Sequence, residues 1–219
     1  MNDALQVAVE PHAFSARDFV GGDAALDFVN TVTGRDQSPR DWLDSYARLL
    51  EWATLVKLLP REVLQRLAKQ AKRESAAAVA ALVRAKILRE QLFSLLTDIS
   101  RRRAPPKGAL ALLRVHWLAG VNAHELRFDG GRVLKKFRDE VNLDSIAGMV
   151  GYRIVEHVLT APLDRLRLCQ GPNCSWLFID SSKGGRRRWC DMAVCGNAAK
   201  SRRFHARTLG QRETVSRLR

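Results

Sequence analysis

The sequence has little that would anchor it to a membrane or export it. No stretch of its 219 residues holds the ~18 uninterrupted apolar residues that a membrane-spanning helix needs. The opening segment MNDALQVAVEP lacks the basic region and the following apolar run of a secretory signal. We therefore expect a cytoplasmic protein that does not enter the membrane. Apolar residues still make up 46% of the chain, which is enough for a sizeable folded core.

Catalytic signatures are missing as well. The sequence contains no P-loop, no dinucleotide-binding glycine motif, no serine nucleophile elbow and no HExxH motif. Its five histidines are scattered, and none has a Cys, Asp or Glu at the spacing of a metal site or an activated nucleophile. We therefore expect a binding protein rather than an enzyme.

Acidic residues are scarce toward the C-terminal end. The whole chain has 37 Lys and Arg against 23 Asp and Glu, a net charge of +14. From Leu163 to Arg219, thirteen basic residues stand against four acidic ones, so a quarter of the chain carries most of the excess. Such a concentration favours a polyanionic partner, most often nucleic acid. Attraction to an anionic membrane surface, or a simple gain in solubility, would also account for the excess.

Hydrophobic periodicity predicts a mainly α fold of the α+β class. Apolar residues recur at steps of three and four in five segments, which predicts helices over 40–59, 60–71, 75–100, 108–122 and 143–159. A further helix begins after the glycine pair that precedes Asp23. Alternation on both sides of Asp129-Gly130-Gly131 predicts a small β-hairpin over 124–137.

Cysteine is scarce, and all four cysteines fall in the last quarter of the chain. Cys169, Cys174, Cys190 and Cys195 form the pattern C-x4-C-x15-C-x4-C. Two short segments that each give two thiolates can surround one tetrahedral Zn2+ ion. Two disulfides or free thiols are the alternatives, and a reducing compartment favours the metal. Four cysteine ligands leave no open position, so we predict a structural Zn2+ rather than a catalytic one.

The sequence around the cysteines predicts a treble-clef-like zinc finger. LRLC and WLFID favour two strands that are joined by the turn at 171–173, and the alanine-rich segment after Cys195 favours a helix. The composition changes sharply after Ala161. We therefore expect a helical domain over 1–161 and a zinc finger over 162–219.

Two segments resemble known bacterial sequences. The segment from Cys169 to Arg207 resembles the CGNR zinc finger in its cysteine spacing, in GRRRWC and in CGN followed by AKSRR. The segment FVGGDAALDFVNTV resembles the opening of the helical ABATE domain, which precedes that finger in the same proteins. The resemblance implies a stress-induced transcription regulator with a DNA-binding finger. Ala198 stands where the family has an arginine.

The basic residues of the finger form two groups. The loop before Cys190 contributes Lys183, Arg186, Arg187 and Arg188, and its two glycines would let the backbone approach a phosphate closely. On the following helix, Lys200, Arg203 and Arg207 share one side. We predict that these seven residues contact DNA. A solvated basic surface is one alternative, and an RNA-binding surface with stacking Trp176, Trp189 and Phe204 is another.

Polar residues within the apolar opening of the helical domain are the remaining candidates. Asp27 and Asn30 lie three residues apart, hence on one side of a helix. A helix cap or a hydrogen bond inside the domain would explain them. With Arg153 they are also candidates for a pocket that binds a small effector, or for a hydrolase or isomerase site.

We conclude from the sequence that the chain is a DNA-binding transcription regulator with a structural four-cysteine zinc finger. Its helical domain would sense an effector or form a homodimer, which would extend the few base pairs that one small finger reads. An RNA-binding or protein-interaction adaptor, in which the zinc finger is a structural clip, is the alternative. Oxidation of the thiolates with release of metal would make the finger a redox switch.

Overall fold

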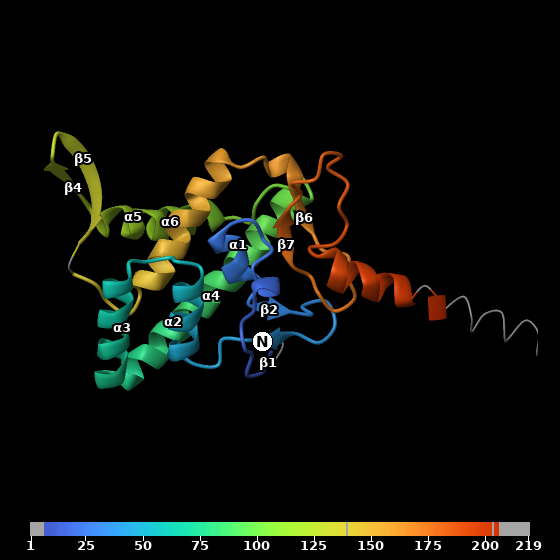
Figure 1. Ribbon diagram of the computed structural model, residues 1–219, viewed down its shortest axis with the longest axis horizontal. Helices are drawn as coiled ribbons and strands as arrows, with labels where there is room; N and C mark the ends of the chain where they lie inside the picture. Colours follow the sequence, from blue (N-terminus) through green and yellow to red (C-terminus); the bar gives the residue numbers. More distant parts are fainter. Residues whose placement is uncertain (1–6, 139, 203, 206–219) are drawn as a thin grey trace, which may run out of the picture.

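The computed structural model describes residues 7–138, 140–202 and 204–205. Figure 1 shows a bundle of helices with a hairpin at one end and the finger at the other. The helices are α1 (Ala24–Val29), α2 (Tyr46–Leu55), α3 (Arg61–Arg73), α4 (Ser75–Ser100), α5 (Ala109–Asn122) and α6 (Ser145–Thr160). Two short 3-10 helices are η1 (Ala16–Asp18) and η2 (Leu163–Arg165), and a π-helical turn, η3 (Met192–Gly196), leads into a finger helix over 197–202. The strands are β1 (Ala8–Val9), β2 (Val32–Thr33), β3 (Arg40–Asp41), β4 (His124–Asp129), β5 (Arg132–Phe137), β6 (Leu166–Leu168) and β7 (Leu177–Ile179).

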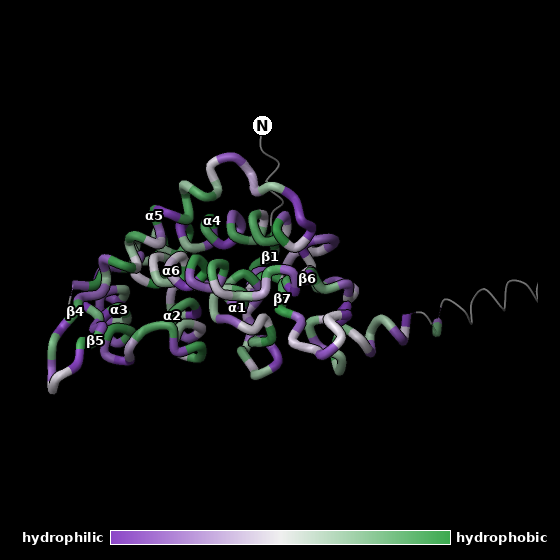
Figure 2. Tube along the Cα trace, turned by 90° about the horizontal axis from the view of Figure 1, so that it is seen from above, coloured by the Kyte–Doolittle hydropathy of each residue, from purple (hydrophilic) through white to green (hydrophobic). Residues whose placement is uncertain are grey.

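The long helix α4 is the centre of the molecule. It contacts α1, α2, α3 and α6 and also both strands of the finger, β6 and β7. Its buried side chains recur at helical spacing, and Ala81, Ala85, Leu88, Leu92 and Leu95 are each 1% exposed. Figure 2 shows hydrophobic (green) segments recurring along α4. One continuous core therefore reaches from the helices into the finger.

The first predicted helix is shorter than its periodicity indicates. The pattern places its start at residue 40, but Arg40 and Asp41 form strand β3. This strand pairs in parallel with β1 and antiparallel with β2, a small sheet that hydrophobic periodicity does not predict. Helix α2 begins only after Ser45, whose hydroxyl oxygen accepts a hydrogen bond from the amide of Arg48 at 3.2 Å.

The predicted hairpin is present with the expected bounds. Strands β4 and β5 pair antiparallel in a register that places Asp129 opposite Arg132. Gly130 and Gly131 both have positive φ, +54° and +79°, as a two-residue type I′ turn requires. The hairpin projects from the body at the end of α5 (Figure 1).

The finger hairpin shares its core with the helical domain. Leu166 of β6 and Leu177 of β7 are 1% and 0% exposed and belong to the same apolar cluster as the helices. The mainly α fold class with small β elements and a C-terminal cysteine cluster is confirmed. Among the described residues, no helix is both long enough and apolar enough to cross a membrane.

Candidate metal centre and nucleic-acid interface

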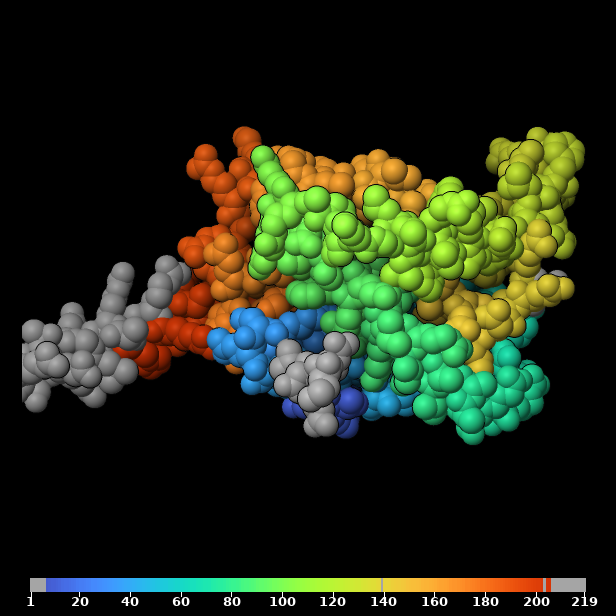
Figure 3. Space-filling view, turned by 180° about the vertical axis from the view of Figure 1, so that it is seen from behind, coloured from blue at the N-terminus to red at the C-terminus, as the bar shows by residue number. Residues whose placement is uncertain are grey.

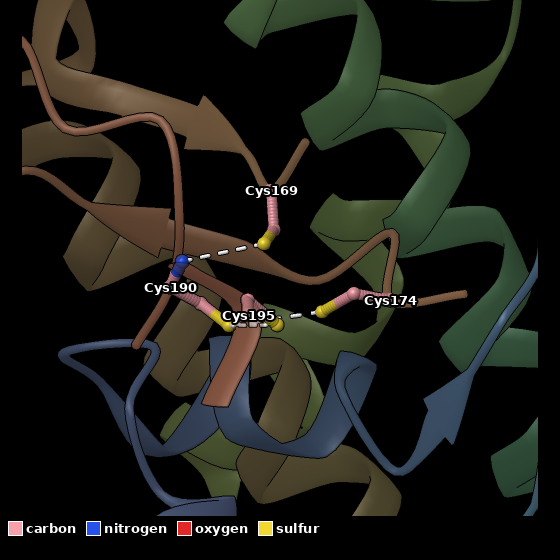
Figure 4. Close-up of side chains that lie close together, drawn as sticks. All are labelled: Cys169, Cys174, Cys190 and Cys195. Atoms are coloured by element: carbon pink, nitrogen blue, oxygen red, sulfur yellow. Dashed lines mark hydrogen bonds between the residues drawn. The ribbon is translucent and has the colours of Figure 1, made fainter. Parts of the chain in front are cut away.

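The structure brings the four cysteines together. Their sulfur atoms all lie within 4.8 Å of one another, and all four side chains are buried. Cys169 follows β6, Cys174 lies in the turn before β7, Cys190 ends the basic loop, and Cys195 lies in η3. Figure 4 shows the four side chains directed toward one common point.

The sulfur spacing fits a tetrahedral metal ion. Cys190 Sγ lies 3.7 Å from Cys174 Sγ and 3.7 Å from Cys195 Sγ. Four sulfurs about 2.3 Å from a central Zn2+ lie about 3.8 Å apart, whereas a disulfide needs about 2.05 Å. The neighbouring thiols, that of Cys174 first, lower the pKa of Cys169, and that of Cys169 raises the pKa of Cys174. Because four thiolates in contact repel one another, the cluster needs a cation to ionise fully.

The backbone around the cluster is shaped for thiolates. The amides of Gly171 and Cys190 each donate a hydrogen bond to Cys169 Sγ at 3.3 Å. A side chain at position 171 would not fit, because its Cβ would lie 2.7 Å from the Cβ of Cys195. The carboxylate of Asp191 accepts a hydrogen bond from the amide of Val194 at 2.8 Å and so begins η3. These residues would hold a structural Zn2+ without an open ligand position.

One buried carboxylate organises the basic loop. Asp180 is fully buried, and its Oδ1 accepts hydrogen bonds from the amide and the hydroxyl of Ser182 at 3.0 and 2.6 Å. Its Oδ2 accepts a hydrogen bond from the amide of Arg187 at 2.8 Å. These bonds, the one from the Ser182 hydroxyl first, lower the pKa of Asp180 to about 2. The loop is therefore fixed to β7 before any partner binds.

The predicted DNA-binding residues differ in their surroundings. Lys183, Arg186, Arg188 and Lys200 have exposed side chains. Arg187 is half-buried, with its guanidinium 4.9 Å from the Phe178 ring centre and a hydrogen bond to the carbonyl oxygen of Cys190. Arg203 and Arg207 lie outside the described residues. Arg202, which the sequence did not suggest, lines a hollow together with Arg188, so the loop and the helix after η3 meet there.

The finger is joined to the helical domain by hydrogen bonds along β7. The side-chain amide of Asn30 donates to the carbonyl oxygen of Leu177 at 2.8 Å and its Oδ1 accepts from the Leu177 amide at 2.9 Å. The amide of Ile179 donates to the carbonyl oxygen of Gly21 at 3.0 Å. The Trp176 indole donates to the carbonyl oxygen of Val32 at 3.2 Å. The finger therefore has one fixed orientation on the domain.

Two known families match the two parts of this arrangement. Residues 22–163 match the ABATE family, described as "Putative stress-induced transcription regulator". The chain belongs to the ABATE family. Residues 165–208 match the CGNR zinc finger, so the resemblance seen in the sequence is confirmed. No curated protein matches the chain.

The CGNR finger of this chain keeps the first three residues of the name, Cys195, Gly196 and Asn197, and replaces the arginine by Ala198. Ala198 lines a cleft between the finger and the N-terminal part of the chain, together with Arg40 and Trp42. The departure from the family pattern therefore lies at an open surface and not in the core.

The three residues considered for an effector pocket each have a partner of their own in the ABATE domain. Asp27 Oδ1 accepts a hydrogen bond from the amide of Gly21 at 2.8 Å, Asn30 binds Leu177, and Arg153 lies 3.4 Å from Asp23. Burial raises the pKa of Asp27 to about 7, against the opposing effect of the Gly21 hydrogen bond. Asn30 thus binds β7 directly at Leu177, and Asp27 binds Gly21, whose carbonyl oxygen accepts the hydrogen bond from Ile179 of β7.

Sequence reasoning missed a buried ion pair in the ABATE domain. Arg89 donates two hydrogen bonds to the carboxylate of Asp41, both at 2.8 Å, and one to the Thr31 hydroxyl at 3.0 Å. Burial alone would raise the pKa of Asp41, but the contacts with Arg89 outweigh it and lower that pKa. The signal in the sequence was the position of Arg89, which falls within the apolar stripe of α4 between Ala85 and Leu92.

Proposed function

We propose that this chain is a cytoplasmic DNA-binding transcription regulator and that its CGNR finger, ordered by Zn2+, is the DNA-binding part. The proposal rests on one hollow beside the cysteine cluster, which Arg188 of the basic loop and Arg202 of the helix after η3 line together with Asp36. Cationic side chains next to one another suit the phosphates of a nucleic-acid backbone. No enzymatic role is proposed.

The loop offers free cations at fixed positions. In the part of the chain that the structure describes, no carboxylate pairs with Lys183 or Arg186, and both side chains are exposed. The hydrogen bonds that Asp180 accepts hold the loop in place, so little conformational entropy is lost when the loop binds phosphate. In this proposal Arg187 helps to position the loop, because its guanidinium packs on the Phe178 ring.

The surroundings of Trp176 argue against its part in the RNA-binding alternative. Its ring is 7% exposed, packs edge-on against Trp42 at 5.4 Å and donates a hydrogen bond to the domain. A ring held in this way cannot stack on an unpaired base. If the chain is an adaptor instead, its affinity for nucleic acid should be weak or independent of the nucleotide sequence.

A selection experiment tests the proposal. The zinc-loaded chain would be used to select duplexes from a random DNA pool at about 0.15 M salt, where non-specific binding is weak. We expect one recurring motif. Recovery of no motif, or of single-stranded RNA in a parallel selection, would favour the adaptor.

A matched pair of variants locates the interface. The first replaces Lys183, Arg186 and Arg188 by Ala, and the control replaces Lys69, Lys72 and Arg73, which lie exposed on α3 far from the finger. Both lose three positive charges. We expect the loop variant alone to lower the slope of log affinity against log salt by about 3. If both variants lower the slope equally, DNA is attracted by the net charge of the chain and not by the loop.

The ABATE domain keeps a predicted sensory role. Because Asp27, Asn30 and Arg153 each bind a neighbour, an effector at these residues would have to displace existing contacts. Displacement of the Asn30 bonds would release β7, which would couple such a ligand to the finger.

A further inference from the structure

The hairpin β4–β5 leaves large apolar side chains in solvent. Leu126, Phe128 and Val133 are 75%, 76% and 67% exposed. Figure 3 shows the hairpin standing out at the end of the molecule that lies opposite the finger. A two-stranded hairpin is only marginally stable in water when its apolar face is uncovered. We therefore expect a partner to cover these exposed side chains.

The two faces of the hairpin differ in character. Side chains alternate along each strand, and the register places Leu126, Phe128 and Val133 on one face. Lys135 shares this face opposite Leu126, and its ammonium group donates a hydrogen bond to the Tyr152 hydroxyl at 3.1 Å. The opposite face holds mostly charged residues, namely Glu125, Arg127, Asp129, Arg132 and Lys136. At the base of the apolar face, His124 contacts Phe137 and Tyr152, so only the outer part of that face is uncovered.

The two edges of the hairpin differ in a way that favours pairing through β4. Strand β5 carries Arg132, Lys135 and Lys136, and lysines on an edge strand oppose the approach of another strand. Strand β4 carries charges of alternating sign at Glu125, Arg127 and Asp129. Because Asp129 and Arg132 close the two-residue turn, the antiparallel pattern directs the backbone N–H and C=O groups of Leu126 and Phe128 outward.

We propose that β4 pairs antiparallel with β4 of a second copy of this chain, about a two-fold axis at Leu126. In this register Glu125 lies opposite Arg127 of the second copy, and the same pair occurs twice because of the symmetry. Leu126 lies opposite Leu126, and Phe128 lies opposite His124. A register centred on Arg127 would instead place Glu125 opposite Asp129, which is repulsive.

The result is a four-stranded sheet that crosses the dimer. The outward backbone groups of Leu126 become hydrogen-bonded, and its side chain is covered by the same residue of the second copy. Helix α5 leads into β4 and carries two further exposed apolar side chains, Val115 and Val121, which are 63% and 39% exposed. The interface is small, so we expect a micromolar dissociation constant.

Charge reversal tests the pairing in the full chain. Glu125→Arg leaves Arg at both 125 and 127, and Arg127→Glu leaves Glu at both, so each variant alone should dimerise more weakly than the natural chain. An equimolar mixture should form a heterodimer, because every Arg then faces a Glu. Sedimentation velocity over a dilution series from about 1 to 100 µM would measure the dissociation constants of all three, and we expect that of each single variant to rise at least about tenfold.

The mixture also controls for folding, since a misfolded variant would not be rescued by its complement. The double variant Glu125→Arg/Arg127→Glu restores the pairing and should dimerise like the natural chain. Glu62→Arg on α3 is the matched control for net charge and should leave the dimer unchanged. A monomeric natural chain, or single variants that dimerise normally, would overturn the proposal.

Discussion

Asn30 and Leu177 are joined by two hydrogen bonds although 147 residues separate them. The side-chain amide of Asn30 donates and accepts as a backbone peptide of a neighbouring strand would. It therefore completes the hydrogen bonds of β7 on the side away from β6. The zinc finger and the ABATE domain meet through a specific polar contact inside a shared core.

Replacing Asn30 by Ala should destabilise the chain strongly. The change leaves the N–H and C=O groups of Leu177 buried without partners, which we expect to cost about 2–4 kcal/mol. Urea unfolding followed by circular dichroism measures it. Asn122→Ala, at the exposed end of α5, is the control and should change the free energy of unfolding by less than about 0.5 kcal/mol. Equal losses in both variants would refute the special role of Asn30.

Removal of metal should weaken the whole chain and not the finger alone. Leu166 and Leu177 lie in the core shared with the helices, so unfolding of the finger exposes part of that core. We expect Cys190→Ser, or a chelator, to lower the melting temperature of the main transition by about 10 °C or more. If calorimetry shows that the main transition is unchanged and that a second, separate transition disappears with the metal, the finger unfolds independently.

Stability should fall as the pH rises from about 4 to about 7, through Asp27. Its pKa is about 7 in the folded chain and 3.8 in the unfolded reference, so between these values the folded chain keeps a proton that the unfolded chain has lost. The slope contributed by this group is at most about 1.4 kcal/mol per pH unit. Asp27→Asn keeps the acceptor for Gly21 and should remove that slope. Urea unfolding of both chains at about pH 5 and pH 7 gives the comparison, and equal slopes would assign the pH dependence to other groups.

The ion pair between Arg89 and Asp41 should matter far more than an exposed pair on the same helix. Arg89→Met leaves the Asp41 carboxylate buried, with Lys86 as its remaining cationic partner, which we expect to cost about 3–5 kcal/mol. Arg84→Met removes the exposed pair with Asp144, which water screens, and should lower the free energy of unfolding far less. Denaturant unfolding of both variants measures the difference. Similar losses in the free energy of unfolding would show that the buried pair contributes no more to stability than the exposed pair.

Local features of the fold could be predicted from the sequence, because their causes are local. The apolar stripe of α4 and the Gly130-Gly131 turn depend on residues close in the chain, and the structure has both elements where the sequence places them. The cysteine spacing likewise predicted a common cluster, because two short ligand segments have few ways to meet around one point.

Contacts between distant segments could not be predicted. Strand β3 is two residues long and exists because β1 and β2 flank it, so its sequence carries no alternation to detect. The partner of Arg89 lies 48 residues away, and no periodicity names Asp41. The role of Asp180 in fixing the basic loop depends on bonds to Ser182 and Arg187 that only the folded loop provides.

The hairpin and the finger stand at opposite ends of the molecule (Figure 3). Helix α4, with 26 residues, is about 39 Å long and extends between these ends (Figure 1). Two chains joined at β4 would therefore hold their fingers farther apart than one ~34 Å turn of duplex DNA. Because each finger is fixed to its domain by Asn30, the dimensions of the helical domain would set the spacing of two half-sites. An operator with adjacent half-sites would then require a bent duplex or a single bound finger.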